Sequence, residues 1–306
     1  MNPTYYVNPD FKKTERLFPP QGRYEYKRHD MNENPEGVPL DFVQKVLSKI
    51  TPEFLSTYPE ASRFEEKYAN FVGVNKDNIM TTNGSDQAIR YILQTFGEPG
   101  KKVVTASPTF EMYWVNCSLL GLKHVGVPYA EDLSFDSQLL LNSIDHDTRV
   151  VVLLNPNNPI GNVYTEEEVE TIIRKSKEVG AVVVIDEAYH YFYKKTYLAH
   201  INTYDNVLIL RTFSKCFSLA ACRLGVIIAH SELIKWVRKP RLSFDVNSIA
   251  LLFAESLLDS PDVISYLIKT QDDGKSFALH TLAQHGYECM DCHGNYIFIK
   301  IFMFFF

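Results

Sequence analysis

The sequence predicts an α/β protein with a mostly parallel, mixed sheet flanked by helices. Three observations lead to this prediction. Short apolar runs alternate with helical patterns from about residue 80 onward. The run at 149–154 is apolar throughout its core, as expected for a strand covered on both faces. Thr165 and Glu168 form a capping-box signal just before the next helical pattern. Strands that alternate with helices are typical of parallel sheets.

The individual elements follow in chain order. Apolar residues spaced i, i+3, i+4 and i+7 from Ile89 to Phe96 predict one buried helix face. After residue 246 the pattern is mainly helical, until strand-like segments return near 287–300. Residues 1–35 are polar and aromatic without periodicity and are predicted to form an arm. The apolar runs that predict strands lie at 102–106, 149–154, 181–185, 206–210 and 224–229.

Composition excludes several classes of protein. The 306 residues carry 31 basic and 37 acidic side chains, a net charge of −6, and 45% of them are hydrophobic. This balance excludes global disorder, and without a dense Lys/Arg block it argues against a nucleic-acid partner. The N-terminus lacks the pattern of a signal peptide, and the apolar run 296–306 is too short to span a bilayer. We therefore expect a cytoplasmic protein without a membrane partner.

The cysteines and acidic runs do not predict a metal site. The five cysteines are an odd, scattered set, which favours reduced thiols over a disulfide framework. Residues 289–293 match the C-x-x-C-H haem-attachment pattern, but such attachment requires export, so coincidence is the favoured interpretation. A second Cys/His pair suited to zinc is not evident. The Glu166–Glu168 run is explained as the first turn of a helix.

Polar segments follow the predicted strands at the places where ligands bind in open α/β sheets. The segment 82–86 precedes the first clear helix, so its backbone N–H groups can hold an anion at the positive helix terminus. Each segment alone has an ordinary explanation as a turn, a helix cap or a solvated surface. Their combination and order are what carry information. The segments are 82–86, 107–110, 155–161, 186–189 and 211–215, with Arg223 shortly after the last.

Together these segments resemble the fold-type I, pyridoxal-phosphate-dependent aminotransferases, and specifically the histidinol-phosphate aminotransferase group. The resemblance extends from Asn32-Glu-Asn-Pro35 to about Asn295. Asn83-Gly-Ser-Asp86, Asn155-Pro-Asn-Asn-Pro159 and Arg211-Thr-Phe-Ser-Lys215 carry it in combination. It implies pyridoxal 5'-phosphate as cofactor, an amino donor and a keto acceptor as small-molecule partners, and a homodimer.

The resemblance also implies roles around the cofactor ring. Lys215 would hold the cofactor aldehyde covalently and move the substrate proton, which requires a lysine that loses its own proton near neutrality. Asp186 would face the pyridine nitrogen and keep it protonated. Tyr189 and Asn158 would hydrogen-bond the phenolic oxygen. Phe110 matches the ring-stacking aromatic.

Further roles concern the cofactor phosphate and the substrate. Tyr58 matches a tyrosine that reaches the phosphate bound by the neighbouring subunit. Asn34 and the flanking arm would lie near the substrate. The arginine fork suits a phosphate dianion. The resemblance assigns phosphate binding to the backbone at Ser85 and Asp86, the hydroxyls of Thr212 and Ser214, and Arg223, and it includes Gly84 among the cofactor-binding residues.

Three divisions of the chain are predicted: an arm at 1–35, a cofactor-binding large domain at 36–258 and a partial small α+β domain at 259–306. The family's small domain continues beyond the segment that matches 295–299, and that continuation carries the arginine for the substrate carboxylate. We therefore expect a truncated chain. The apolar end at 301–306 suggests a frameshift or early stop as the cause.

Several positions depart from the family pattern. Ile160 stands where threonine is usual, Ser218 where glycine is usual, and Ala221-Cys222 where Gly-Leu is usual. The segment 241–247 is a variant of Arg-x-Pro-Tyr-x-Val-Asn, so the substrate loop differs.

The first functional interpretation is an aminotransferase acting on a phosphorylated amino compound. A decarboxylase of serine or threonine phosphate shares the same catalytic residues and stays open as the alternative. An inactive, truncated remnant is a third possibility. A transcriptional regulator is disfavoured because no helix-turn-helix precedes residue 36.

Overall fold

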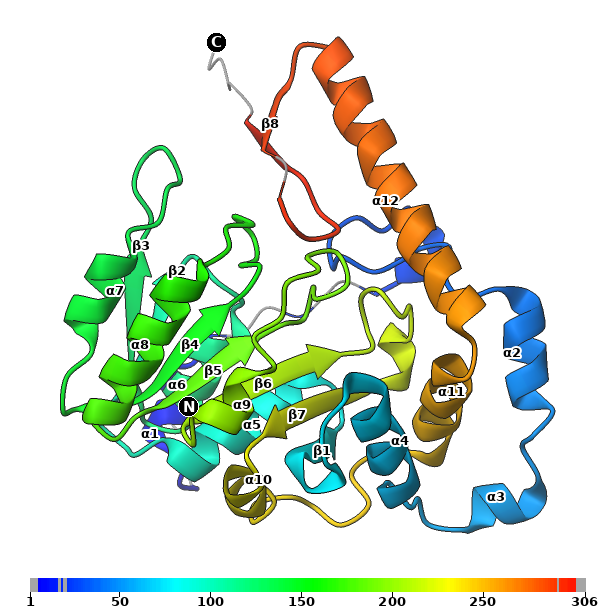
Figure 1. Ribbon diagram of the computed structural model, residues 1–306, viewed down its shortest axis with the longest axis horizontal. Helices are drawn as coiled ribbons and strands as arrows, with labels where there is room; N and C mark the ends of the chain where they lie inside the picture. Colours follow the sequence, from blue (N-terminus) through cyan, green and yellow to red (C-terminus); the bar gives the residue numbers. More distant parts are fainter. Residues whose placement is uncertain (1–4, 16–17, 19–20, 291, 301–306) are drawn as a thin grey trace.

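The described part of this computed structural model comprises residues 5–15, 18, 21–290 and 292–300. Its centre is a seven-stranded sheet with the order β1-β7-β6-β5-β4-β2-β3 (Figure 1). Strands β2 to β6 pair in parallel, whereas β7 is antiparallel to both β6 and β1. The strands are β1 Ile79–Thr82, β2 Lys102–Ser107, β3 Lys123–Pro128, β4 Thr148–Leu154, β5 Val182–Asp186, β6 Val207–Thr212 and β7 Gly225–Ala229.

The fold class predicted from the sequence is confirmed, and the predicted strands are present within one or two residues of their expected bounds. The sequence pattern did not single out β1 or β3. Both lie at the edges of the sheet, and β3 is largely exposed or half-buried, so it lacks the continuous apolar run of a central strand.

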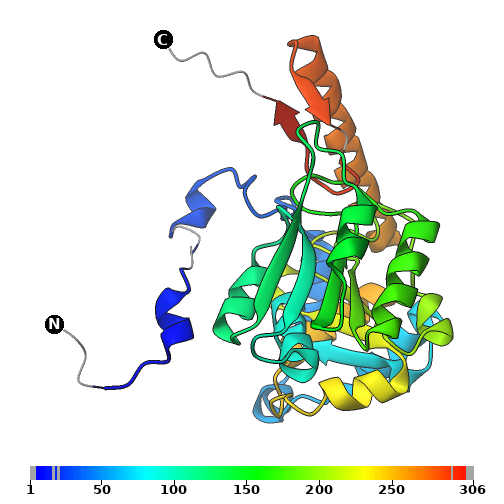
Figure 2. The same cartoon turned by 90° about the vertical axis from the view of Figure 1, so that its left-hand side faces the viewer.

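Helices cover both faces of the sheet, which Figure 2 shows edge-on. Successive residues of a strand face opposite sides, and the two cores divide accordingly. Val183 belongs to the core that also contains residues of α4, α8 and α11, whereas Val184 belongs to the core that contains residues of α5, α6 and α10. The helices of the main body are α2 Leu40–Leu47, α3 Pro52–Ser56, α4 Ser62–Val72, α5 Ser85–Phe96, α6 Met112–Leu119, α7 Ser137–Ser143, α8 Glu166–Glu178, α9 His200–Thr203, α10 Ser231–Val237 and α11 Ser248–Leu258.

Local sequence signals explain where key helices begin. The capping box predicted at Thr165 and Glu168 is present, with both reciprocal hydrogen bonds, at the start of α8. The helix predicted from the Ile89–Phe96 face is α5, and it buries Ile89, Ile92 and Leu93. Gly84 caps α5 with a left-handed φ of 78°, which glycine tolerates without a Cβ penalty.

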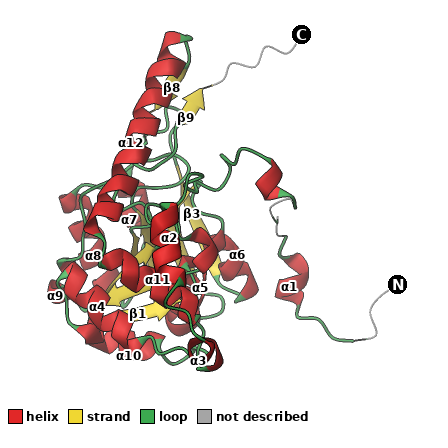
Figure 3. Cartoon of the chain, turned by 90° about the vertical axis from the view of Figure 1, so that its right-hand side faces the viewer, coloured by secondary structure: helices red, strands yellow, loops and turns green. Residues whose placement is uncertain are grey.

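The two ends of the chain lie outside the main body. The arm runs along one side through α1 Pro9–Lys13 and the short 3-10 turn Arg23–Glu25. At the other end, α12 Pro261–Gln284 rises away from the sheet and is followed by the hairpin of β8 Glu288–Met290 and β9 Phe298–Lys300 (Figure 3). The division at residues 35 and 258 stays a prediction. The apolar run at 301–306 lies outside the described residues.

Within the described residues, no helix combines the length and apolar character needed to cross a membrane.

Candidate active site

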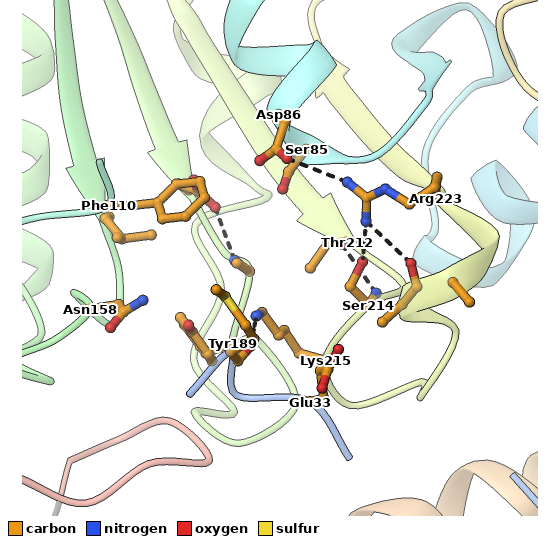
Figure 4. Close-up of a pocket in the computed structure, with 16 residues that line it drawn as sticks. Glu33, Ser85, Asp86, Phe110, Asn158, Tyr189, Thr212, Ser214, Lys215 and Arg223 are labelled. Atoms are coloured by element: carbon orange, nitrogen blue, oxygen red, sulfur yellow. Dashed lines mark hydrogen bonds and ion pairs between the residues drawn. The ribbon is translucent and has the colours of Figure 1, made fainter. Parts of the chain in front are cut away.

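The polar segments predicted at the strand ends meet at the carboxyl edge of the parallel strands. There they surround a cavity of about 320 Å³, within the range of small-molecule sites. Figure 4 shows side chains from the arm, α5, β6 and the loops after β4 and β5 pointing into it. The lining residues are Met31, Glu33, Ser85, Asp86, Phe110, Leu154, Asn158, Asp186, Ala188, Tyr189, Thr212, Ser214, Lys215, Ala220, Ala221 and Arg223.

One end of the cavity is built to receive an anion. Gly84 makes no side-chain capping bond, so the first N–H groups of α5 are left for a ligand. The Arg223 guanidinium lies beside them, 3.4 Å from Ser214 Oγ and 3.4 Å from Asp86 Oδ2. A Cβ at Gly84 would lie only 2.6 Å from Arg223 Nη2, so only glycine lets the helix and the arginine approach this closely.

Asp186 ends β5 and is 2% exposed. Its Oδ2 accepts a hydrogen bond of 2.7 Å from the Tyr113 hydroxyl, and its Oδ1 accepts one of 3.1 Å from the Ala188 amide. Burial raises the pKa of Asp186 to about 6, because a low-dielectric setting disfavours the charged form. A cationic ring nitrogen beside Asp186 would favour the ionised carboxylate that burial disfavours.

Lys215 lies on the loop after β6, and its Nζ donates a hydrogen bond of 2.6 Å to the Met31 carbonyl. Burial lowers the pKa of Lys215 from its ordinary value, and Arg223 lowers it further, although Asp86 and Glu33 oppose this shift. A larger share of the amine is therefore neutral near pH 7, the form in which lysine is a nucleophile.

The Tyr189 ring forms one wall beside Lys215, whose Nζ is 6.0 Å from the ring centroid. The hydroxyl of Tyr189 accepts a 2.9 Å hydrogen bond from Asn32 Nδ2, so the arm closes this side of the cavity. The Tyr296 ring packs edge-on against Tyr189 with 5.0 Å between centroids. Asn158 and Phe110 also line the cavity, and their places around a cofactor ring stay predictions.

Two predicted residues lie outside this cavity. Tyr58 is 73% exposed and stacks on Phe244, with 4.5 Å between ring centroids. Asn34 lines a smaller neighbouring pocket with Ser214 and donates a 2.7 Å hydrogen bond to Ser218 Oγ. The other predicted site residues, Thr212 included, line the cavity, and Gly84 directly borders it through the start of α5.

Sequence reasoning missed several cavity residues. Met31 and Glu33 come from the arm and contribute a backbone carbonyl and a carboxylate. Tyr113 does not line the cavity, but its hydroxyl donates to the Asp186 carboxylate, and no sequence motif assigned it a role. Glu33 belongs to the Asn32-Glu-Asn-Pro35 motif and Met31 directly precedes it, which was the available signal for the arm.

The departures from the family pattern are accommodated locally. Ser218 adopts a left-handed φ of 58°, which explains why glycine suits this position. Ile160 is buried in the segment 155–161, and Cys292 packs against it, with Sγ 3.3 Å from the Ile160 carbonyl oxygen.

A potential metal-ligand group lies elsewhere. Glu166, Glu170 and His200 bring one ligand atom each within 4.8 Å of one another. Lys195 is 2.9 Å from Glu166, however, and Arg174 is 3.1 Å from Glu170, so both carboxylates already have cationic neighbours.

The donor set fits pyridoxal 5'-phosphate. The anion cradle, formed by the first N–H groups of α5 and by Arg223, suits a phosphate. The buried carboxylate of Asp186 suits a protonated ring nitrogen, and Lys215, with its lowered pKa, suits an aldehyde. Such an arrangement at the strand ends of a mixed sheet defines a pyridoxal-phosphate-dependent transferase of fold type I.

The chain belongs to the aminotransferase class I and II family, whose model matches residues 30–299. Its relatives include the histidinol-phosphate aminotransferase of Thermotoga maritima, 31% identical over 96% of this chain and 85% of the relative. The enzyme of the same name from Pyrococcus furiosus is 33% identical over 78% of this chain and 70% of the relative. The chain is therefore a pyridoxal-phosphate-dependent aminotransferase of the histidinol-phosphate aminotransferase type.

Solved structures agree on the fold. Histidinol-phosphate aminotransferase from Sinorhizobium meliloti, solved in complex with pyridoxal-5'-phosphate, superposes with a TM-score of 0.86 at 21% identity, covering 97% of this chain and 82% of that one. Aspartate aminotransferase from Thermus thermophilus with maleate gives a TM-score of 0.77 at 20% identity, covering 87% and 75%.

Proposed function

We propose that this chain transfers an amino group between a phosphorylated amino compound, with histidinol phosphate as the first candidate, and a keto acid. The observation that carries the proposal is the convergence of Lys215, Asp186 and Arg223 on one cavity although they come from separate strand ends. The names of the relatives from Thermotoga maritima and Pyrococcus furiosus support the substrate.

The residues divide the work by position. The cofactor phosphate would be held at the start of α5 by the backbone N–H groups of Ser85 and Asp86, by the hydroxyls of Thr212 and Ser214, and by Arg223. Asp186 would hold the ring nitrogen in its protonated form, and Phe110 would provide the aromatic face for the ring. Bound in this way, pyridoxal phosphate supplies an electron sink for the bonds around the substrate Cα.

The cavity residues then act on protons and orientation. The neutral Lys215 amine is suited by its lowered pKa to accept the proton from the substrate Cα and to deliver it to the carbon that receives the amino group. Tyr189 and Asn158 would orient the ring through its phenolic oxygen. Asn34 and the arm exclude water from the substrate side, since Asn32 already bonds to Tyr189.

The same proposal includes a homodimer and a cytoplasmic location. Tyr58 is strongly exposed and remote from the cavity of its own chain, which suits a role at the cavity of a second copy. Sedimentation of the purified protein tests the assembly, and a Tyr58→Phe variant tests the shared site: cofactor affinity falls if Tyr58 reaches the partner's phosphate.

Absorbance of the purified protein with added pyridoxal phosphate tests the central claim. The intact chain is expected to show the absorbance of a lysine-linked cofactor, and Lys215→Ala is expected to lose it together with at least a thousandfold of turnover. Lys194→Ala is the matched control, because Lys194 is an exposed lysine outside the cavity.

Turnover with histidinol phosphate and 2-oxoglutarate tests the reaction. Formation of glutamate supports the proposal. Release of CO2 from serine or threonine phosphate without keto-acid formation contradicts it in favour of decarboxylation. Retention of the lysine-linked absorbance by Lys215→Ala contradicts the assignment of the lysine.

A further inference from the structure

We propose that Tyr113 is a positioning residue of this enzyme, whose hydroxyl fixes the Asp186 carboxylate and holds it in the ionised form that the cofactor ring requires. The proposal rests on the proposed role of Asp186. It concerns a residue of helix α6 that lies 73 positions before the aspartate in the chain.

The geometry leaves the carboxylate little freedom. Tyr113 donates to Oδ2 over 2.7 Å, and the Ala188 amide donates to Oδ1 over 3.1 Å, so each oxygen has its own donor. Tyr113 is 1% exposed and Asp186 is 2% exposed, so water does not compete for these bonds. Rotation of the carboxylate would break both hydrogen bonds at once.

The charges around Asp186 show why a donor is needed there. Burial opposes its ionisation, and the negative charges of Asp86 and Glu187 oppose it further. The bonds from Tyr113 and Ala188 are the contributions that lower the pKa. On the cavity side, Lys215 and Tyr189 are the other titratable groups that the carboxylate influences.

Tyr113 is suited to remain a donor. Burial and the neighbouring Asp186 raise the pKa of its hydroxyl well above the ordinary value, so the proton stays on Tyr113 across the working pH range. Its ring packs in the core formed by α5, α6 and the sheet. The ring therefore has a packing role that phenylalanine could fill, whereas the hydroxyl is directed at the carboxylate.

The test compares Tyr113→Phe with the intact holoenzyme. We expect the single-turnover rate of amino transfer to the bound cofactor to fall about tenfold, because a hydrogen bond to a charged group is lost. We expect KM to stay within about twofold, because Tyr113 does not line the cavity. The pH midpoint of the cofactor absorbance should shift by about one unit.

Tyr197→Phe is the control for the loss of a buried tyrosine hydroxyl. Tyr197 is also 1% exposed, and its hydroxyl donates to the Tyr164 carbonyl, away from the cavity. We expect its single-turnover rate and its absorbance midpoint to match the intact enzyme. A drop equal to that of Tyr113→Phe would overturn the proposal, since it would show a general effect of core hydroxyls.

A double-mutant cycle with Asp186→Asn separates this proposal from the proposed function. If Tyr113 acts through Asp186, its substitution has no further effect on the rate in the Asp186→Asn background. An additional tenfold loss there overturns the proposal alone. Full activity of Asp186→Asn itself would contradict the proposed function instead.

A second replacement keeps the test independent of folding defects. The residue 3-fluorotyrosine at position 113 retains the ring and hydroxyl but has a more acidic O–H, so it is a stronger donor. We expect the absorbance midpoint to shift in the direction opposite to that of Tyr113→Phe. The same direction for both replacements would overturn the proposal.

Discussion

Asp186 and Glu187 are consecutive, buried carboxylates, yet only Glu187 is paired with a cationic side chain of the protein. Glu187 belongs to a paired network with Arg211, Thr196 and Tyr197: Arg211 contributes bonds of 3.0 and 2.9 Å, Thr196 one of 2.9 Å, and the Tyr197 amide one of 2.7 Å. Asp186 receives neutral donors and faces the cavity. The charge of Glu187 is therefore balanced by Arg211 within the protein, whereas the charge of Asp186 is left for a cationic ligand group to balance.

This difference has a structural purpose. The paired network ties the segment after β5 to the end of β6, because Glu187 and Arg211 lie on these two neighbouring segments. It thereby fixes the strand ends that carry Asp186 and Lys215. Rigid support beneath an incompletely satisfied site is what preorganised binding requires.

Arg211→Met tests the first half of the comparison and carries the largest expected effect on stability. Glu187 would remain as a buried charge without its partner, since its side chain is 1% exposed. We expect the free energy of unfolding to fall by about 3–5 kcal/mol, measured by urea denaturation of the apo protein. The Glu187→Gln/Arg211→Met double variant should recover part of this loss. A double variant no more stable than Arg211→Met would contradict the assigned cause.

Asp186→Asn tests the unpaired carboxylate of the comparison, and here the substitution is expected to raise the free energy of unfolding. The folded-state pKa of about 6 lies above the ordinary carboxyl value near 3.9, so ionisation opposes folding. This cost is absent below about pH 4, grows up to pH 6 and is complete above it. We expect apo Asp186→Asn to exceed the intact chain by about 2–3 kcal/mol at pH 8 and to match it near pH 4.

Asp147→Asn is the control for that pH profile. Asp147 is exposed, and the hydrogen bond from Lys101 lowers its pKa, so its contribution to stability is present at high pH and lost on acidification. Its substitution should therefore lower stability at pH 8. An Asp186→Asn effect that does not change with pH would refute the electrostatic explanation.

Gly84→Ala tests the close approach at the anion cradle. Two costs are expected: a positive φ for alanine and a Cβ 2.6 Å from Arg223 Nη2. Displacing the guanidinium should raise the Kd for pyridoxal phosphate about tenfold, equivalent to about 1.4 kcal/mol. Gly180→Ala shares the positive φ, at 77°, but has open space around its Cβ. It should cost stability without changing the Kd; equal Kd values for both variants would rule out the steric argument.

Particular residues show what the sequence could and could not predict. The strand ends that carry Asp186 and Lys215 were predictable, because apolar runs define buried strands and polar motifs follow them. The Thr165 capping box was predictable because it is local. The hydrogen bonds from Tyr113 to Asp186 and from Lys215 to Met31 were not, since they join residues 73 and 184 positions apart. Pairing at such separation is set by the packed fold and leaves no local pattern.

The ion pair of Lys269 and Asp273 on α12 provides an exposed counterpart to the buried Glu187–Arg211 pair. Its loss has the smallest expected effect on stability. These side chains are 75% and 64% exposed, so water solvates both charges whether or not they touch. Lys269→Met should change the free energy of unfolding by no more than about 0.5 kcal/mol, measured by urea denaturation beside Arg211→Met. Both variants replace a cation of an ion pair with the same apolar residue and differ mainly in burial. A loss above about 2 kcal/mol for Lys269→Met would mean that burial is not what gives the Glu187–Arg211 pair its weight.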